Sequence, residues 1–211
     1  MIIVDVETTG LSPARHSLVS IGAVEFSKPD NQFYGDCRIW EGAEVDPEAL
    51  AINGFTDGYV RTHPVSLEEL TCRFLDWAQG IPERTLGGEN VQFDQKFLTA
   101  AGERAKQGWI FGYRMVDLHA LSYASHLELF GEVPLKKGTS ALGLDATLRY
   151  VGLPPEPTQH HALTGARMEA EAFSRLIFKK GLLKEFSSYP IPEIGTPKMR
   201  SLLDLFRILR G

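Results

Sequence analysis

Short apolar runs dominate the first forty residues and have the lengths of β-strands. Residues 1–6 form a mainly apolar run that predicts a buried strand. Residues 18–26 form a second run with β-branched side chains, and apolar residues alternate with polar ones over residues 33–39. Two shorter strands are predicted further along, at residues 84–88 and 115–116. The pattern therefore places most of a β-sheet in the N-terminal part of the chain.

Helical spacing of apolar residues begins after residue 65. Ser66 and Glu69 form a capping box, and leucine, phenylalanine and tryptophan follow at helical spacing. The strongest helix signal covers residues 162–180, where alanine, phenylalanine and isoleucine share one face. Further helices are predicted at residues 93–104, 118–129, 140–151 and 199–209, with Pro- and Gly-rich loops at 131–138 and 154–157. Strands followed by helices mixed with short strands predict an α/β fold with helices covering the sheet.

Length and composition fit one globular domain with a small terminal appendage. The chain has 211 residues, of which 43% are hydrophobic and 23% charged, which excludes a largely disordered chain or a coiled coil. No apolar run approaches the roughly 20 residues that cross a bilayer, and no secretion signal is evident. Cys37 and Cys72 are too few for a disulfide framework or a Cys-based zinc site. We therefore expect a cytoplasmic protein without a membrane partner.

The net charge is unevenly distributed. The total of −5 argues against a polyanionic partner, but residues 1–133 carry −10 and residues 134–211 carry +5. One interpretation is an uneven solvated surface. The other is an acidic, metal-binding cluster in the first part and phosphate-facing charges in the second. Composition does not decide between them.

Two carboxylates lie close together at the end of the first predicted strand. Asp5 and Glu7 are separated by one residue, so on a strand they point to the same face about 7 Å apart. Like charges there repel, and a divalent cation between them relieves the repulsion. Oxygen ligands favour Mg²⁺ or Mn²⁺ over zinc. The alternative is a solvent-exposed strand end, whereas an Asp-x-Asp phosphatase is disfavoured because the second acid is Glu.

Two further segments carry candidate chemistry. Asp94 stands near the start of a predicted helix, where a carboxylate is also an ordinary cap or dipole partner. His160 and His161 precede the long helix, and histidine suits a general base because it titrates near neutrality. Taken alone, such a histidine pair is also typical of surface residues at a helix start.

Together these segments resemble the DnaQ-like 3′–5′ exonucleases of the DEDDh type, the group that includes RNase T and the proofreading subunit of DNA polymerase III. The sequence DVETTG at residues 5–10 resembles the first family motif, and ENVQFDQKFL at 89–98 resembles the second. HHALTGA at 160–166 resembles the third, in which Ala, Asp and Ala follow the histidine at +2, +5 and +6. Lesser matches at residues 52–56 and 116–118 extend the resemblance over roughly residues 1–178.

The resemblance implies an RNase H-like mixed sheet flanked by helices, with an exonuclease domain over residues 1–180. It also implies two Mg²⁺ or Mn²⁺ ions about 3.5–4 Å apart. Asp5 would contact both ions, Glu7 the ion that prepares the attacking water, and Asp94 the second ion through water. His160 would act as general base, and the product would be a 5′-mononucleotide.

The same resemblance implies where the substrate binds. The backbone of Thr8, Thr9 and Gly10 would seat the 3′-terminal nucleotide of a single-stranded DNA or RNA, and Leu11 would pack against its base. Stacking on apolar side chains is tolerant of base identity, so little sequence preference is expected.

Gly165 departs from the family pattern, because the family has its fourth acid at that position. Counting from His161 does not restore the match, since its +5 residue is Ala166. Glycine is also a poor helix residue, costing about 1 kcal/mol relative to alanine, and has no evident structural motive there. Engineered inactivation and natural loss would leave the same glycine, and either predicts strongly reduced activity. Compensation by Glu169, one turn along the helix, is the alternative that keeps the activity.

Two other functions compete with an active nuclease. Gly165 is also what a non-catalytic nucleic-acid-binding or regulatory module with an exonuclease fold would show. An unrelated α/β hydrolase is disfavoured, because the chain has neither a nucleophile elbow nor a Walker-type glycine loop.

Residues 181–211 lie outside the resemblance and are expected to form a C-terminal helical extension. The apolar residues at 202–209 are too many for a free helix in water. We expect them to dock on the domain itself, with a homodimer or a polymerase or repair partner as the alternative.

Overall fold

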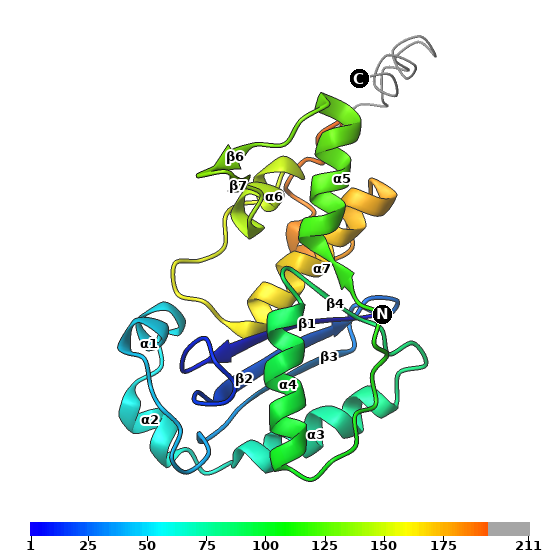
Figure 1. Ribbon diagram of the computed structural model, residues 1–211. Coiled ribbons are helices and arrows are strands. Elements are labelled where there is room, and N and C mark those ends of the chain that lie inside the picture. Colours follow the sequence, from blue (N-terminus) through cyan, green and yellow to red (C-terminus); the bar gives the residue numbers. More distant parts are fainter. Residues whose placement is uncertain (194–211) are drawn as a thin grey trace.

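The computed structural model describes residues 1–193, which form one mixed five-stranded sheet covered by helices on both faces (Figure 1). The strands are β1 (Ile2–Thr8), β2 (Leu18–Glu25), β3 (Gln32–Asp36), β4 (Leu86–Gly88) and β5 (Val116–Asp117), in the order β3-β2-β1-β4-β5. β1 is antiparallel to β2 and parallel to β4. The RNase H-like mixed sheet predicted from the sequence is confirmed.

Seven α-helices belong to the described residues. They are α1 (Pro47–Asn53), α2 (Asp57–Thr62), α3 (Leu67–Gln79), α4 (Gln92–Arg104), α5 (Leu118–Phe130), α6 (Leu144–Tyr150) and α7 (Ala162–Phe178). A short hairpin joins β6 (Leu135–Lys136) to β7 (Thr139–Ser140), and one 3₁₀ turn spans Lys184–Phe186. The Ser66 side chain accepts a hydrogen bond from the Glu69 backbone N–H, which confirms the predicted start of α3.

Two parts of the helix prediction differ from the structure. The helix predicted at residues 140–151 begins only at Leu144, because Ser140 pairs with β6 and Gly143 is extended at the N-cap position. α1 and α2 were not predicted, although Asp46 caps α1 and Pro47 opens it, which is a recognisable start signal. These helices are short and carry little apolar periodicity, so the apolar pattern did not mark them.

The two faces of β1 have different partners. Ile2, Val4 and Val6 pack into a core with α3 and α4, whereas Ile3 packs on the opposite face in a core with α5, α6 and α7. Because side chains alternate along a strand, Asp5 and Glu7 share the face of Ile3. Alternation along the strand thus puts both carboxylates on the face of the sheet that α7 covers.

Gly22 on β2 allows α7 to lie directly on the sheet. A β-carbon at Gly22 would overlap the backbone of Ala162 and Leu163, which cannot move aside as a side chain can. Gly22 is also the cross-strand partner of Asp5. The first turns of α7 therefore lie against the strand pair that carries Asp5.

The chain after α7 folds back onto that helix through two buried charged residues. The Arg175 guanidinium donates to Glu171 Oε1 (2.7 Å) and to the carbonyl oxygens of Phe186 (3.0 Å) and Tyr189 (3.1 Å). Glu171 Oε2 accepts from the backbone N–H groups of Leu182 and Leu183. The domain boundary at residue 180 stays a prediction, and the helix predicted at 199–209 lies outside the described residues. Within residues 1–193 no helix combines the length and apolarity needed to span a bilayer.

Candidate active site

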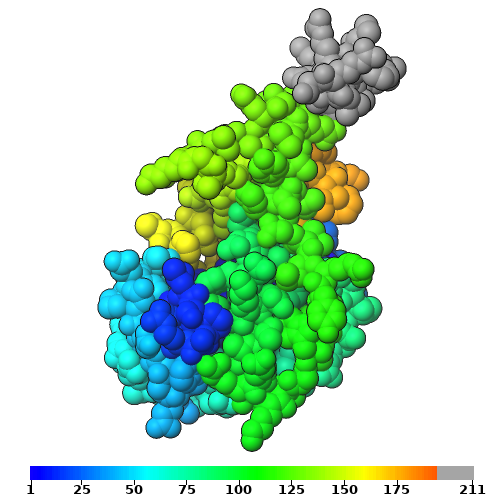
Figure 2. Space-filling model, in the orientation of Figure 1, coloured from blue at the N-terminus to red at the C-terminus, as the bar shows by residue number. Residues whose placement is uncertain are grey.

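A cavity of about 400 Å³ opens at the carboxyl end of β1. The segment after β1, dark blue in Figure 2, lies at the surface between the cyan α1–α2 segment and the green helices. Among the residues that line the cavity are Asp5, Glu7, Thr8, Gly10, Leu11, Ile52, Asn53, Glu89, Phe93, Asp94 and His160. The three motifs singled out in the sequence therefore meet at one place.

Asp94 reaches the cavity from the first turn of α4. Its Oδ1 accepts a hydrogen bond from the Val6 backbone N–H over 3.0 Å. β4 pairs with β1 at Ile2 and Ile3 and ends at Gly88, so Val6 lies beyond the last strand pairing on that side. Asp94 thus occupies the space where β4 has ended. It does not cap α4, since no side-chain cap bond is present among the described residues at that helix start.

The cavity concentrates negative charge in a poorly hydrated place. Burial, followed by the nearby charges of Asp94 and Glu7, raises the pKa of Asp5 well above its usual value. Burial raises the pKa of Asp94 in the same direction. Burial and the neighbouring Glu156 raise the pKa of Glu7 to about 7. Each carboxylate therefore costs free energy when ionised, unless a cation compensates it.

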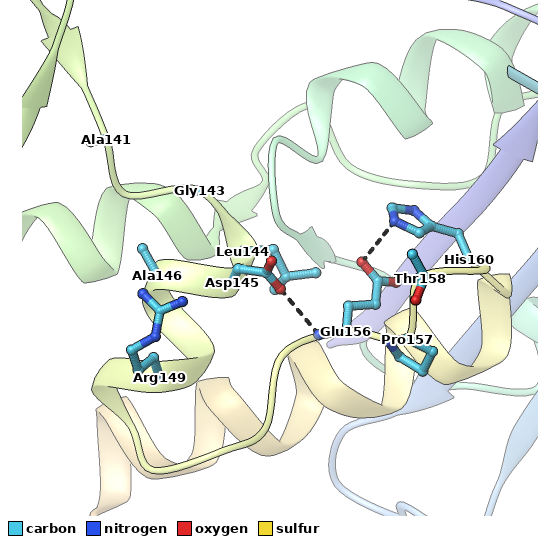
Figure 3. Close-up of a pocket in the computed structure, with 10 residues that line it drawn as sticks. All are labelled: Ala141, Gly143, Leu144, Asp145, Ala146, Arg149, Glu156, Pro157, Thr158 and His160. Carbon is cyan, nitrogen blue, oxygen red and sulfur yellow. Dashed lines mark hydrogen bonds and ion pairs between the residues drawn. The ribbon is translucent and has the colours of Figure 1, made fainter. Parts of the chain in front are cut away.

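Glu156 is a carboxylate of this cluster that the sequence motifs did not indicate. It lies in the loop between α6 and α7, and its backbone N–H donates to Asp145 Oδ1 over 3.0 Å (Figure 3). Its side chain is 9% exposed, and its Oε2 lies 3.6 Å from His160 Nε2. An acid four residues before the motif histidine, between two prolines, is the only local signal for it.

Gly165 faces the same carboxylates from α7. A β-carbon at this position would overlap Asp5 Oδ2 and lie 3.2 Å from Glu156 Oε1. A side chain here would displace the Asp5 carboxylate, which is a steric consequence that the sequence does not reveal. Position 165 nevertheless points into the carboxylate cluster.

Glu169 lies one turn further along α7 and is 3% exposed. Its Oε2 has no hydrogen-bond partner among residues 1–193, and it lies 3.3 Å from where a β-carbon on Gly88 would stand. Burial and then the charges of Asp5 and Asp94 raise its pKa well above the usual value. A buried carboxylate oxygen without a partner needs a proton or a cation.

The two adjacent histidines have different surroundings. His160 lines the cavity, and its backbone N–H donates to the Ile52 carbonyl over 2.9 Å. It also borders a second hollow of about 620 Å³ next to α6 (Figure 3). His161 instead caps α7 by accepting from the Thr164 N–H, and its ring stacks on Tyr34. Only His160 is therefore placed to act in the cavity.

The end of β1 and the loop that follows it present three of the four predicted substrate-binding residues to the cavity. Thr8, Gly10 and Leu11 line it, and Leu11 is 82% exposed at its mouth. Thr9 is fully buried, and its hydroxyl donates to the Glu44 carbonyl over 2.7 Å. Gly10 has φ +153°, and a β-carbon there would overlap the His16 ring, so this close turn requires glycine. Thr9 supports the loop from inside.

The donor set fits a hard divalent cation such as Mg²⁺ or Mn²⁺. The groups that face one another are carboxylates, and two buried carboxylate oxygens, Oε2 of Glu89 and Oε2 of Glu169, lack a partner among the described residues. Across residues 1–193, no three His, Cys, Asp or Glu side chains already surround a common point closely enough to hold a metal. A cation would therefore have to draw these side chains inward, against their mutual repulsion.

The chain is similar to known proteins along most of its length. The profile of the RNase T family, described as exonuclease, matches residues 2–173. Ribonuclease T of Yersinia pseudotuberculosis serotype O:1b is 28% identical, over 90% of this chain and 89% of its own length. Ribonuclease T of Histophilus somni is 26% identical over 90% of this chain.

Solved structures share the fold. The zinc-bound complex of Escherichia coli exonuclease I with single-stranded DNA superimposes with a TM-score of 0.67 at 17% identity, over 84% of this chain. A moderately thermophilic exonuclease I from Methylocaldum szegediense gives a TM-score of 0.65 at 19% identity, over 85% of this chain. This chain spans 40% and 41% of the lengths of those two proteins, respectively.

Proposed function

This chain belongs to the RNase T family of DnaQ-like exonucleases, and from that membership we propose that it is a divalent-metal-dependent 3′–5′ exonuclease of single-stranded nucleic acid. The observation that carries the proposal is the cavity in which Asp5, Glu7 and Asp94 meet His160. Three carboxylates and one histidine from separate segments are an unusual set for a purely structural pocket, because burying them together destabilises the fold.

Each side chain has a role that its position supports. Asp5, Glu7 and Asp94 would hold two Mg²⁺ or Mn²⁺ ions, with Asp5 central because it faces the other two. Bound ions of this kind polarise a phosphate and make water a stronger nucleophile. His160 would accept a proton from the attacking water, and the imidazolium charge would lie 3.6 Å from Glu156 Oε2. Attack on the terminal phosphodiester bond releases a 5′-mononucleotide.

The rim of the cavity suits a terminal nucleotide. Leu11 and Ile52 are exposed large apolar side chains at the rim, and Phe93 also lines the cavity. Apolar and aromatic surfaces bind bases by stacking, with little dependence on base identity. Escherichia coli exonuclease I has been crystallised with dA16 and dT13 oligonucleotides. The 3′ ends of single-stranded DNA or RNA are therefore the proposed substrates.

Gly165 favours a second candidate, a nucleic-acid-binding module that keeps the fold without hydrolysis. Loss of the family's fourth acid predicts weakened metal binding and strongly reduced activity. Whether the chain is impaired depends on whether another carboxylate takes the place of that acid.

Shortening of a 5′-labelled oligonucleotide tests both candidates. The full chain is incubated with single-stranded DNA or RNA in Mg²⁺, in Mn²⁺ and in EDTA. We expect a ladder of products shortened from the 3′ end that requires the metal and is abolished in Asp94→Asn. Glu103→Gln, an exposed acid on the far end of α4, is the matched control and should cleave normally. Binding of the oligonucleotide in metal without shortening would instead support the non-catalytic module.

A further inference from the structure

We infer that Glu156 supplies the fourth carboxylate of the metal site, in place of the acid missing at Gly165. The inference rests on the proposed function, because it assigns a residue to that same site. The acid would come from the loop before α7 instead of from α7 itself.

The distances around position 165 carry this assignment. Glu156 Oε1 lies 3.2 Å from the point where a β-carbon on Gly165 would stand, within reach of a carboxylate built on that carbon. The Asp5 carboxylate carbon lies 3.0 Å from the same point. Glu156 Oε1 and the Asp5 carboxylate therefore both border the space into which an aspartate at position 165 would place its oxygens.

The loop holds Glu156 in this position. Pro155 and Pro157 flank it, and both restrict the backbone. Asp145 at the start of α6 accepts the Glu156 backbone N–H over 3.0 Å (Figure 3). The side chain is nine-tenths buried and pairs with His160 through its other oxygen. A carboxylate fixed by backbone and side-chain contacts is prepared for a ligand without further ordering.

A second observation points to a cation at this cluster. Glu169 Oε2 is buried and has no hydrogen-bond partner among residues 1–193. Its oxygen lies beside Gly88 on β4, whereas Glu156 lies beside position 165. We therefore assign Glu156, which borders position 165, to the place of the missing acid, and the buried Glu169 oxygen is a group that a proton or a nearby cation would compensate.

The arrangement also explains why glycine suits position 165. Asp5 Oδ2 and Glu156 Oε1 already occupy the space that a side chain on Gly165 would enter. Adding an acid to the otherwise unchanged chain would crowd three carboxylates together. An aspartate at position 165 and the glutamate at position 156 are thus alternatives for one place in the site. Each is expected to bind the metal only when the other is absent.

A swap of the two positions tests the inference by metal binding, independently of hydrolysis. Mn²⁺ affinity is measured by titration calorimetry, and the Mn²⁺-induced rise in Tm is recorded alongside, for the full chain and its variants. We expect Glu156→Gln to weaken Mn²⁺ binding about 10- to 100-fold. Glu156→Gln combined with Gly165→Asp should regain affinity to within a few-fold of the unchanged chain. Gly165→Asp alone should not tighten binding, and Glu103→Gln should leave it unchanged.

The outcomes separate this inference from the proposed function. If the unchanged chain binds Mn²⁺ and Glu156→Gln binds it equally well, the assignment of Glu156 is overturned and the exonuclease proposal stands. The assignment is also overturned if Glu169→Gln is the only one of these variants that removes Mn²⁺ binding. It is overturned as well if the double variant binds Mn²⁺ as weakly as Glu156→Gln. If the unchanged chain does not bind Mn²⁺ at all, both proposals fail.

Discussion

Asp94 Oδ1 accepts a hydrogen bond from the Val6 backbone N–H over 3.0 Å, joining the first turn of α4 to the middle of the site-bearing strand. The bond fixes a carboxylate that α4 supplies against the strand that carries Asp5 and Glu7. The role of Asp94 as a hydrogen-bond acceptor and the role of its negative charge are therefore separable. The charge serves the proposed metal, whereas the acceptor satisfies a buried backbone donor.

Replacing Asp94 in two ways should separate these effects. Asp94→Asn can keep an oxygen towards Val6, so we expect normal stability or a slight gain without metal, and a loss of activity of more than about 100-fold. Asp94→Ala leaves the Val6 N–H unpaired, which costs about 1–3 kcal/mol of folding free energy as well. Urea denaturation and nuclease rates measure the two quantities. Equal stability of the two variants would contradict a structural role for the hydrogen bond.

The carboxylate cluster should make the metal-free protein less stable as the pH rises. Burial raises the pKa of Glu7 from 4.5 to about 7, so the folded state holds this proton more tightly than the unfolded chain. Stability is then lost as the pH rises between these two values. Each kcal/mol lost lowers Tm by about 2–4 °C for a domain of this size. Melting curves at several pH values in EDTA measure the slope.

Added Mn²⁺ should oppose this loss. A cation that binds the ionised carboxylates stabilises the folded state more at pH values above about 7 than below 5. Glu7→Gln should flatten the pH dependence in EDTA and reduce the stabilisation by Mn²⁺. An equal Mn²⁺-induced rise in Tm above about pH 7 and below about pH 5 would argue against the cluster as the binding site.

Gly22→Ala should disturb the site from a distance. Its β-carbon would overlap the backbone of Ala162 and Leu163, so α7 must shift away from β2. We expect a loss of about 1–3 kcal/mol in stability and a larger relative loss in kcat than in substrate affinity. Gly58→Ala is the matched control, since a β-carbon there meets nothing within 4 Å among the described residues. It should be neutral or slightly stabilising.

Leu11→Ala should weaken substrate binding with little effect on the fold. Leu11 is exposed at the mouth of the cavity, so its removal should change stability by less than about 0.5 kcal/mol. Full burial of a leucine side chain is worth about 1.5–3 kcal/mol, so losing its apolar contact with the base predicts a KM increase of up to roughly 10- to 150-fold. Leu127→Ala, at a half-exposed leucine on α5, should leave KM unchanged. An unchanged KM in Leu11→Ala would remove Leu11 from the substrate site.

Ending the chain after Lys180 should destabilise the domain. The truncation would remove the carbonyl groups of Phe186 and Tyr189, to which Arg175 donates hydrogen bonds. It would also remove the backbone N–H groups that donate hydrogen bonds to Glu171. Buried charges that lose such partners typically cost 3–5 kcal/mol. Urea denaturation of the truncated chain measures this cost. The double variant Glu171→Leu and Arg175→Met in the truncated chain should regain stability, because it removes the buried charges. A truncated chain as stable as the full one would contradict a structural role for residues 181–193.

Local sequence was sufficient for most of the elements but not for their boundaries. Continuous apolar runs and the Ser66 capping box are properties of neighbouring residues, so β1, β2 and α3 could be predicted directly. α6 starts four residues late, since Ser140 belongs to β7 and Gly143 is extended at the N-cap position. The partners of the basic residues were harder still, since the ion pair of Arg167 with Glu185 joins residues 18 positions apart.

The sequence by itself determined the order of the motifs, the strand that presents Asp5 and Glu7 to one face, and the absence of an acid at position 165. These follow from spacing along the chain and from the fixed periods of strands and helices. The tertiary structure decided that His160 faces the cavity while His161 caps α7, that Thr9 is internal, and that Glu156 borders the space beside Gly165. Such contacts join residues distant in sequence, and the close packing of α7 on Gly22 sets their geometry.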